Sequence, residues 1–252
     1  MQALSQNFKV LAYRWLVFGK FRWFAKPLYS SVLNSVLAWH RLIDVFHPLD
    51  KGDVSDLSLI IKTFERPYAI KRLVESIRRR YPSIEVIVVD DSRIPLDLAD
   101  VTILKMPYDS GISAGRNAAL DICNTSFFLL LDDDFVFSYR QNLSQLCAYM
   151  NSHAQVDILG GKCIDLPLYI KHDFQKGILP SSLEAKAPLG KKIGRFEAVD
   201  KVQNYFIGRT TTIKAIKWNP LLKVMEHTEF FTRAKGHLTS VYDPDMFILH
   251  AK

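Results

Sequence analysis

Three consecutive aspartates, Asp132 to Asp134, interrupt an otherwise apolar stretch, FFLLLDDDFVF at residues 127–137. Two carboxylates about 4 Å apart repel each other by roughly 4 kcal/mol at an effective dielectric constant near 20. A bound cation, protonation of one carboxyl group, or side chains that point apart would each relieve this repulsion. Mg²⁺ and Mn²⁺ prefer oxygen ligands and complete their shells with phosphate oxygens and water. The cluster therefore predicts a divalent-cation site for a diphosphate substrate, with Asp132 and Asp134 facing one ligand.

The aspartates follow the last of four short apolar runs of strand length, which cover residues 57–63, 84–89, 101–104 and 127–131. Between the first two runs, apolar residues recur with helical spacing from Ile70 to Tyr81, after Pro67 and before Pro82. A second helix is predicted over ISAGRNAALDIC, residues 112–123. Strands that alternate with helices predict an α/β fold whose mixed, mostly parallel sheet is covered on both faces.

Ligands bind beyond the carboxyl ends of the strands in such sheets. Polar residues follow three of the four predicted strands: Lys62, Thr63 and Glu65, then Asp90, Asp91 and Ser92, then the aspartate cluster. One Asp-Asp-Ser after a strand is more typical of a turn or a helix cap, but the three clusters together predict a binding site. Arg116, in GISAGRN, adds a guanidinium group whose geometry matches phosphate oxygens.

In this order and spacing, KTFERP (62–67), VVDDS (88–92), MPYDSGISAGRNAAL (106–120) and LLLDDDFVF (129–137) resemble a family-2-type glycosyltransferase with the GT-A fold. They look most like the catalytic domain of the β-1,4-N-acetylgalactosaminyltransferases that build ganglioside-type glycans. The similarity continues through DILGG, NYFIGRT, HTEFF and LHAK, so it covers residues 57–252. The chain lacks the longer luminal stem and the cysteine pattern of the animal enzymes, which points to a bacterial relative.

The resemblance implies an inverting, metal-dependent transfer of a sugar, expected to be an N-acetylhexosamine, from a UDP-sugar to a glycan or glycolipid. Mn²⁺ or Mg²⁺ would bridge the donor diphosphate. A second metal ligand is expected at His250 in LHAK, although a lone histidine after an apolar strand is more often structural. By similarity, Thr63, Glu65 and Asp91 would line the nucleoside pocket, and Arg116 would lie by the donor. Asp132 would reach the ribose and Asp134 would bind the metal. Asp133 would contact backbone or neighbouring side chains.

An inverting transfer needs a general base to take the proton of the acceptor hydroxyl. By similarity this base is Glu229 in HTEFF, while Glu226 is either the base instead or a structural carboxylate. His227 is structural or near the acceptor, and Trp218 stacks on an acceptor sugar or, as slightly favoured, lies in the core. The segment 172–198 is rich in Gly, Pro and Lys and is either a lid that orders over the bound donor or a plain surface excursion.

Residues 1–46 are expected to form a separate basic segment, followed by a linker over 47–56. The net charge is +7, and Lys9, Arg14, Lys20, Arg22, Lys26 and Arg41 all precede the first acidic residue, Asp44. Basic residues interleaved with Trp, Phe and Leu predict a helical appendage on an anionic membrane surface; packing on the catalytic domain is the alternative. The same interleaving argues against nucleic acid as a partner. No uncharged stretch reaches the ~20 residues that span a bilayer.

The three cysteines, Cys123, Cys147 and Cys163, are odd in number and widely spaced, which argues against a disulfide framework or a zinc site and for a reducing compartment. No cleavable signal peptide is evident. We therefore expect a cytoplasmic enzyme, peripheral on the inner face of the cell membrane. Two alternatives stay open: a haloacid-dehalogenase-type phosphohydrolase with Asp132 as nucleophile and Asp134 as acid/base, and a non-catalytic nucleotide-binding membrane module.

Overall fold

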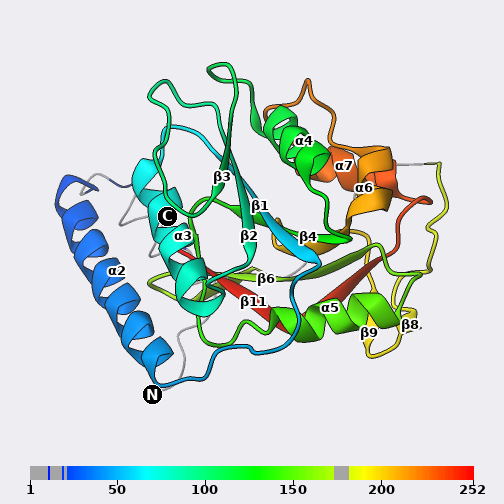
Figure 1. Cartoon of the computed structure of the whole chain (residues 1–252), viewed down its shortest axis with the longest axis horizontal. Helices are drawn as coiled ribbons and strands as arrows, with labels where there is room; N and C mark the ends of the chain where they lie inside the picture. The colour runs from blue at the N-terminus through cyan, green and yellow to red at the C-terminus, as the bar shows by residue number, and fades with distance from the viewer. Residues whose placement is uncertain (1–10, 12–18, 20–21, 173–181) are drawn as a thin grey trace.

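The computed structural model describes residues 11, 19, 22–172 and 182–252 (Figure 1). Most of the predicted N-terminal segment before residue 22, and residues 173–181 of the predicted lid, lie outside the described residues. In the described part, a mixed sheet carries helices on both faces, so the predicted fold class is confirmed. The helices are α2 (Arg22–Val45), α3 (Pro67–Arg80), α4 (Ile112–Ile122), α5 (Leu143–Ser152), α6 (Thr210–Ile216) and α7 (Glu226–Ala234).

Four parallel strands form one half of the sheet, and all four were predicted from apolar runs. They are β1 (Leu57–Thr63), β2 (Glu85–Asp90), β3 (Thr102–Lys105) and β4 (Phe127–Asp132), paired in the order β3-β2-β1-β4. Because they are parallel, their carboxyl ends meet at one edge, where Thr63 lies opposite Asp90 and Lys62 opposite Asp132. The polar clusters that follow these strands are therefore neighbours in space.

The other half of the sheet was not predicted strand by strand. It contains β6 (Ile158–Asp165), β10 (Phe206–Arg209) and β11 (Ser240–His250), with the short strands β5 (Phe135–Val136), β7 (Ile170–His172), β8 (Lys192–Ile193) and β9 (Phe196–Ala198). Strand β10 lies antiparallel between β4 and β6, and β11 pairs in parallel with β6. Strands β6 and β11 thus run in the direction of β4, and their last residues, Asp165 and His250, are register partners at the same edge as Asp132.

The two faces of the sheet bury separate apolar clusters. Along β1, Leu59 and Ile61 face α3 and α5, whereas Ile60 faces the opposite cluster with α4, α6 and α7. This alternation is the two-residue period of a strand, and both helical layers can be followed in Figure 1. Burial on both faces explains why the strand sequences are continuous apolar runs instead of alternating ones.

Helix α2 lies beside α3 at the margin of the molecule (Figure 1). Its Leu33 and Leu37 are buried in a third apolar cluster, together with residues of β5, β6 and β11 and their flanks: Val136, Ile164, Leu166, Leu249 and Ala251. Tyr29 also donates a hydrogen bond to the carbonyl oxygen of Leu166, at 2.8 Å. One side of α2 therefore packs on the half of the sheet that contains β6 and β11. Within the part of the chain that the structure describes, none of the helices has the length and apolar character of a membrane span.

Candidate active site

Two arginines bind the three aspartates at the end of β4. Asp132 accepts a hydrogen bond from Arg116 at 3.0 Å, from the α4 side. Arg66, in the turn after β1, bridges the other two, donating to Asp133 at 2.8 Å and to Asp134 at 2.6 Å. The arrangement answers the question of charge repulsion raised by the sequence, since guanidinium groups separate and neutralise the carboxylates.

The aspartates differ in acidity although they are adjacent in the chain. Burial raises the pKa of Asp133 to about 6, against the opposing hydrogen bond from Thr63 and the charge of Arg66. Burial acts in the same direction on Asp134, but His250 and Arg66 more than compensate for it and hold its pKa at about 2. Asp134 is consequently fully ionised at neutral pH, as a cation ligand must be, whereas the protonation of Asp133 is sensitive to nearby charge.

His250 is held between two carboxylates. Its Nε2 lies 2.9 Å from Asp134 Oδ1, and its Nδ1 lies 2.8 Å from Asp165 Oδ1. Asp165 also pairs with His172 at 3.1 Å and with Lys252 at 2.9 Å. Burial lowers the pKa of His250, but the two carboxylates outweigh burial and raise it to about 9. A carboxylate on one imidazole nitrogen is the usual support for a histidine whose other nitrogen binds a metal.

The donor atoms fit the predicted cation. Asp134 and His250 would offer one oxygen and one nitrogen from the same edge of the sheet, ligand types that Mn²⁺ accepts. Because its raised pKa keeps His250 protonated at neutral pH, the imidazole would bind a metal only after Nε2 loses its proton. Among residues 22–172 and 182–252, no three His, Cys, Asp or Glu side chains are assembled into a metal site. The remaining ligands of a cation at this position would have to come from substrate phosphates and water, which is the usual pattern for Mg²⁺ in phosphate-binding enzymes.

A cavity of about 720 Å³ opens over this edge of the sheet. Its volume lies in the range of small-molecule sites. The walls combine the three aspartates and His250 with four cationic side chains, which suits a ligand that carries phosphate groups. The complete lining is Lys62, Phe64, Arg66, Asp109, Gly111, Ile112, Asp132, Asp133, Asp134, Asn204, Lys223, His250 and Lys252.

The residues predicted for the nucleoside pocket lie together at the ends of β1 and β2, but their polar atoms are engaged within the protein. Thr63 donates to Asp133 at 2.7 Å. Asp91 is fully buried, pairs with Lys62, and accepts from the backbone N–H of Gly111 at 3.0 Å. Glu65 has a left-handed φ of 55° and accepts from the backbone N–H of residue 93 at 2.9 Å. None of these three lines the cavity, whereas Asp132, Asp134 and His250 do.

Arg116 connects the aspartate cluster to α7. Its guanidinium group is 2% exposed and binds Asp132 on one side and Glu226 on the other, both at 3.0 Å. Arg116 does not line the cavity, so its contacts support Asp132 from behind. Glu229 lies one turn further along α7, pairs with Arg233 at 2.7 Å, and is not a lining residue either. The structure therefore links Glu226, and not Glu229, directly to the aspartates.

Two aromatic candidates, Trp218 and His227, are engaged by other residues of the protein. Trp218 is 1% exposed and stacks on Phe230 with ring centroids 4.9 Å apart, so it belongs to the core. His227 Nε2 lies 2.6 Å from the carbonyl oxygen of Val202. Burial, reinforced by the charge of Arg116, lowers the pKa of His227 to about 3, so this imidazole is neutral at physiological pH.

Sequence reasoning missed several residues of the site. Asp165 is the last residue of β6, as Asp132 is the last residue of β4. Polar residues at the carboxyl ends of strands were taken as candidates, so Asp165 would have been found if β6 had been predicted. Arg66 appeared in the sequence analysis only within the motif KTFERP, and its two carboxylate partners depend on a turn that the sequence does not reveal. Asn204 and Lys223 reach the cavity from loops before β10 and α7 and carry no local signal.

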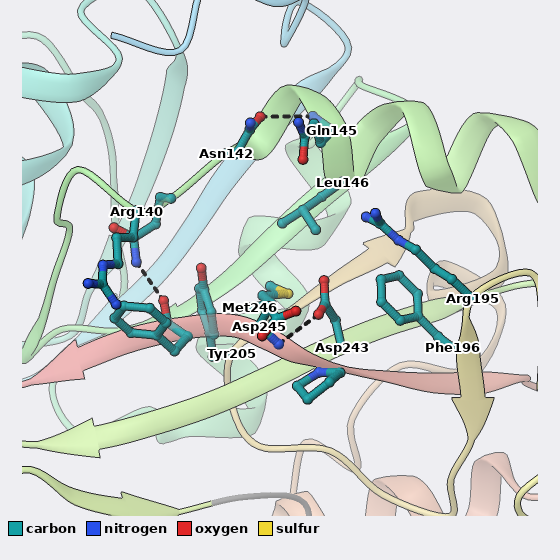
Figure 2. A pocket seen from close by; sticks show the side chains of 13 residues that line it. Arg140, Asn142, Gln145, Leu146, Arg195, Phe196, Tyr205, Asp243, Asp245 and Met246 are labelled. Carbon is teal, nitrogen blue, oxygen red and sulfur yellow. Dashed lines mark hydrogen bonds between the residues drawn. The ribbon is translucent and has the colours of Figure 1, made fainter. Parts of the chain in front are cut away.

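A second cavity, of about 350 Å³, lies between the start of α5, the β8–β9 hairpin and the middle of β11 (Figure 2). Its polar groups have structural roles. Asn142 caps α5 by accepting from the backbone N–H of Gln145 at 3.2 Å, and Asp243 accepts from the backbone N–H of Asp245 at 2.8 Å. None of the predicted site residues lines this cavity, so the chemistry is assigned to the larger one.

Comparison with known proteins bears on the family and the fold. The sequence model of Glycosyl transferase family 2 matches residues 58–172, which contain β1 to β7. The matched segment belongs to this family of glycosyltransferases, and the chain has the GT-A fold, as the resemblance predicted. The match also removes the phosphohydrolase alternative, because the aspartates of β4 belong to the matched segment.

Among curated proteins, the chain is similar to β-1,4 N-acetylgalactosaminyltransferase 2 of Mus musculus, with 32% identity over 77% of this chain and 39% of the mouse protein. It is 30% identical to β-1,4 N-acetylgalactosaminyltransferase 1 of Homo sapiens, again over 77% of this chain and 39% of the relative. The chain thus spans about two-fifths of the length of these relatives.

Two solved structures share the fold. The crystal structure of S. aureus TarS 1-349 in complex with UDP-GlcNAc has a TM-score of 0.57 at 20% identity, over 78% of this chain and 58% of that one. The structure of GalNAc-T7 with UDP, GalNAc and Mn²⁺ has a TM-score of 0.58 at 13% identity, over 81% and 45% of the two chains.

Proposed function

We propose that the protein transfers an N-acetylhexosamine from a UDP-sugar to a hydroxyl group of a glycan or glycolipid, with inversion at the anomeric carbon and with a divalent cation bound. The observation that carries this proposal is the cavity at the carboxyl edge of the sheet, where Asp134 and His250 face a space lined by four cations. The relatives in the N-acetylgalactosaminyltransferase group and the UDP-GlcNAc and Mn²⁺ complexes of the structural neighbours support the donor class and the cation.

In the proposed site, Asp134 and His250 would hold the cation, and its chemistry there would be to neutralise charge on the diphosphate. Lys62 and Lys223 lie in the same lining, and each would pair with phosphate oxygens by exchanging its present partner, Asp91 or Asp109. Asp132 would accept a hydrogen bond from the ribose, while Arg116 keeps its carboxylate oriented. Asp165 holds the ring of His250 so that Nε2 faces the ligand. Thr63, Glu65 and Asp91 would shape the nucleoside pocket through the loops that they anchor.

The reaction forms a bond between the acceptor oxygen and the anomeric carbon, and it breaks the bond from that carbon to the donor phosphate. UDP leaves with the bonding electrons, and the acceptor proton passes to a carboxylate. We propose Glu229 as this base. Glu226 is kept as the alternative, because its ion pair with Arg116 connects it to the aspartate cluster. In either case an existing ion pair, with Arg233 or with Arg116, would have to rearrange when the acceptor binds.

The direct test is a screen of UDP-sugars with Mn²⁺, with Mg²⁺ and with a chelator, reading UDP release with and without saccharide acceptors. UDP-N-acetylhexosamine should give the fastest release, and the chelator should abolish it. Glu229→Gln should lower kcat by about 10²–10⁴-fold if Glu229 is the base, and Glu226→Gln is the matched control. Asp134→Ala that folds but releases no UDP would also exclude a module that only binds nucleotide. Equal release with and without the cation would overturn the metal-dependent mechanism.

A position on the inner face of the cell membrane completes the proposal. Its support is the charge of the N-terminal segment, where six basic residues precede the first acidic one. Anionic lipid attracts such segments by roughly 1 kcal/mol for each basic residue near the surface. The acceptor would then be a saccharide presented at that surface.

A further inference from the structure

Helix α2 has two apolar sides, and only one of them is covered by the protein. Leu33 and Leu37 are 5% and 7% exposed, because they pack on the half of the sheet that contains β6 and β11. The opposite side carries Leu28, Val32, Trp39, Leu42 and, just after the helix, Phe46, with exposures of 58%, 43%, 58%, 51% and 77%. At 3.6 residues per turn these five positions fall in one narrow stripe. We call this stripe the outer face of α2.

The outer face gathers five exposed apolar side chains on one side of the helix, with Ser35 between Val32 and Trp39. Single exposed apolar residues are normal, whereas a contiguous set marks an interaction site. Its composition, one tryptophan among aliphatic side chains and a phenylalanine, is that of helices that lie in the boundary between lipid headgroups and acyl chains. The helix itself lacks the apolar character of a span, so a position in the plane of the interface is the geometry that remains for contact with lipid.

A basic groove runs along one flank of the outer face, between α2 and α3. It encloses about 340 Å³ and is lined by Arg41 from α2 and by Lys71 and Arg72 from α3, with Glu75 as the acidic member. Arg41 and Glu75 are both about half exposed and 3.5 Å apart, a geometry that contributes little to stability. A groove with an excess of positive charge beside an apolar stripe is complementary to an anionic lipid headgroup beside its acyl chains.

We infer that α2 docks on a lipid bilayer through its outer face, with anionic headgroups in the groove formed by Arg41, Lys71 and Arg72. A second copy of the chain is a poorer occupant, because a symmetric contact would bring two such basic grooves towards each other. The inference deepens the proposed function and depends on it in one respect: the bilayer would present the acceptor.

The inner side of α2 explains why this docking matters for the active site. Leu33 and Leu37 pack on Ile164 and Leu249, the residues directly before Asp165 and His250. The edge of the sheet that carries the proposed cation ligands is therefore fixed to the helix that contacts lipid. A saccharide attached to a membrane lipid would be held near the cavity, and free saccharides would lack this advantage.

The test uses the full chain and sedimentation with vesicles of phosphatidylcholine alone or with about one-third phosphatidylglycerol. Wild-type protein should bind the anionic vesicles. Trp39→Glu/Leu42→Glu should bind at least ten-fold more weakly, and Arg41→Gln/Lys71→Gln should lose most of the preference for phosphatidylglycerol. The matched control is Ile94→Glu/Leu189→Glu, which adds the same charge at side chains that are 80% and 60% exposed elsewhere, and it should bind as the wild type does.

Three results would overturn the inference: no binding by the wild type, equal binding by Trp39→Glu/Leu42→Glu, or equal loss in the control. Light scattering after size exclusion tests whether the outer face binds a second copy of the chain instead of lipid. A dimer that dissociates only in Trp39→Glu/Leu42→Glu would show that it does. Unchanged thermal midpoints show that the variants are folded. UDP release in solution without lipid should be the same in all variants, so failure of the proposed function is distinguishable from failure of membrane docking.

Discussion

Replacement of Arg116 by Met should destabilise the protein strongly, because one buried guanidinium group serves two carboxylates. Its side chain is 2% exposed, and the partner side chains of Glu226 and Asp132 are 10% and 31% exposed. Removal of one partner from a buried ion pair costs about 3–5 kcal/mol, since it leaves an uncompensated charge. For a chain of this size that corresponds to a decrease of roughly 6–20 °C in the thermal midpoint.

The dependence on pH gives this prediction a second, independent measurement. Burial already raises the pKa of Asp132, and Arg116 opposes that shift. Without Arg116 the folded-state pKa rises further above the unfolded value, so the folded variant prefers a protonated carboxyl group. Its stability relative to wild type should therefore recover as the pH falls from 7 to 5. Urea unfolding followed by circular dichroism at both pH values measures the two effects.

Two further variants isolate the cause. Arg116→Met leaves the carboxylates of Asp132 and Glu226 without their cationic partner, and adding Glu226→Gln removes one of these two charges. Glu226→Gln should therefore lower the unfolding free energy less in the Arg116→Met background than in wild type. Arg93→Met is the matched exposed control, and its effect should stay below about 1 kcal/mol. A loss below about 1 kcal/mol for Arg116→Met, without any dependence on pH, would refute the reasoning that Arg116 is the structural support of Asp132.

Three more predictions concern other parts of the fold. His227 has a pKa lowered to about 3, so its contribution to stability is complete above the unfolded value near 6.5 and is lost as the pH falls below it. Between pH 7 and 5.5 wild type should lose about 1 kcal/mol more unfolding free energy than His227→Gln; equal slopes would contradict this. Gly161→Ala would place Cβ against the carbonyl oxygen of Met246, too close for van der Waals contact. Denaturant titration should show a decrease of about 1–3 kcal/mol or more in the unfolding free energy. Asp165→Asn should weaken Mn²⁺ binding, measured by calorimetry, by about 10–100-fold by releasing His250; an unchanged affinity would exclude the supporting role.

The parallel half of the sheet was predictable because its signals are local. Each of β1 to β4 contains a short apolar run, and three of these runs, in β1, β2 and β4, end in polar clusters at the same edge. Asp132 and Asp134 line the cavity at this edge, and the roles assigned to them stay predictions. His250, identified by the resemblance, lies with them because β11 pairs in register with β6.

The remaining part of the site was hidden because its signals are not local. Strand β10 is inserted antiparallel between β4 and β6, although it is more than 70 residues away from β4 along the chain. Arg66 and Arg116 acquire their roles only through contacts over long sequence separations. Burial around Asp133, which decides its pKa, is likewise a property of the assembled fold. The base stays a prediction for the same reason, since Glu226 and Glu229 differ only in what they contact.

The packing of α2 has a practical consequence for handling the protein. Removal of the first 46 residues, a common way to improve the behaviour of membrane-associated enzymes, would uncover the apolar surface that Leu33 and Leu37 now protect. It would also remove the carboxylate of Asp44, which accepts a hydrogen bond of 2.7 Å from the backbone N–H of Tyr139. The shortened protein should aggregate instead of becoming more tractable. Mild detergent that masks the exposed side of the helix, with the chain kept intact, is the better route to purified enzyme.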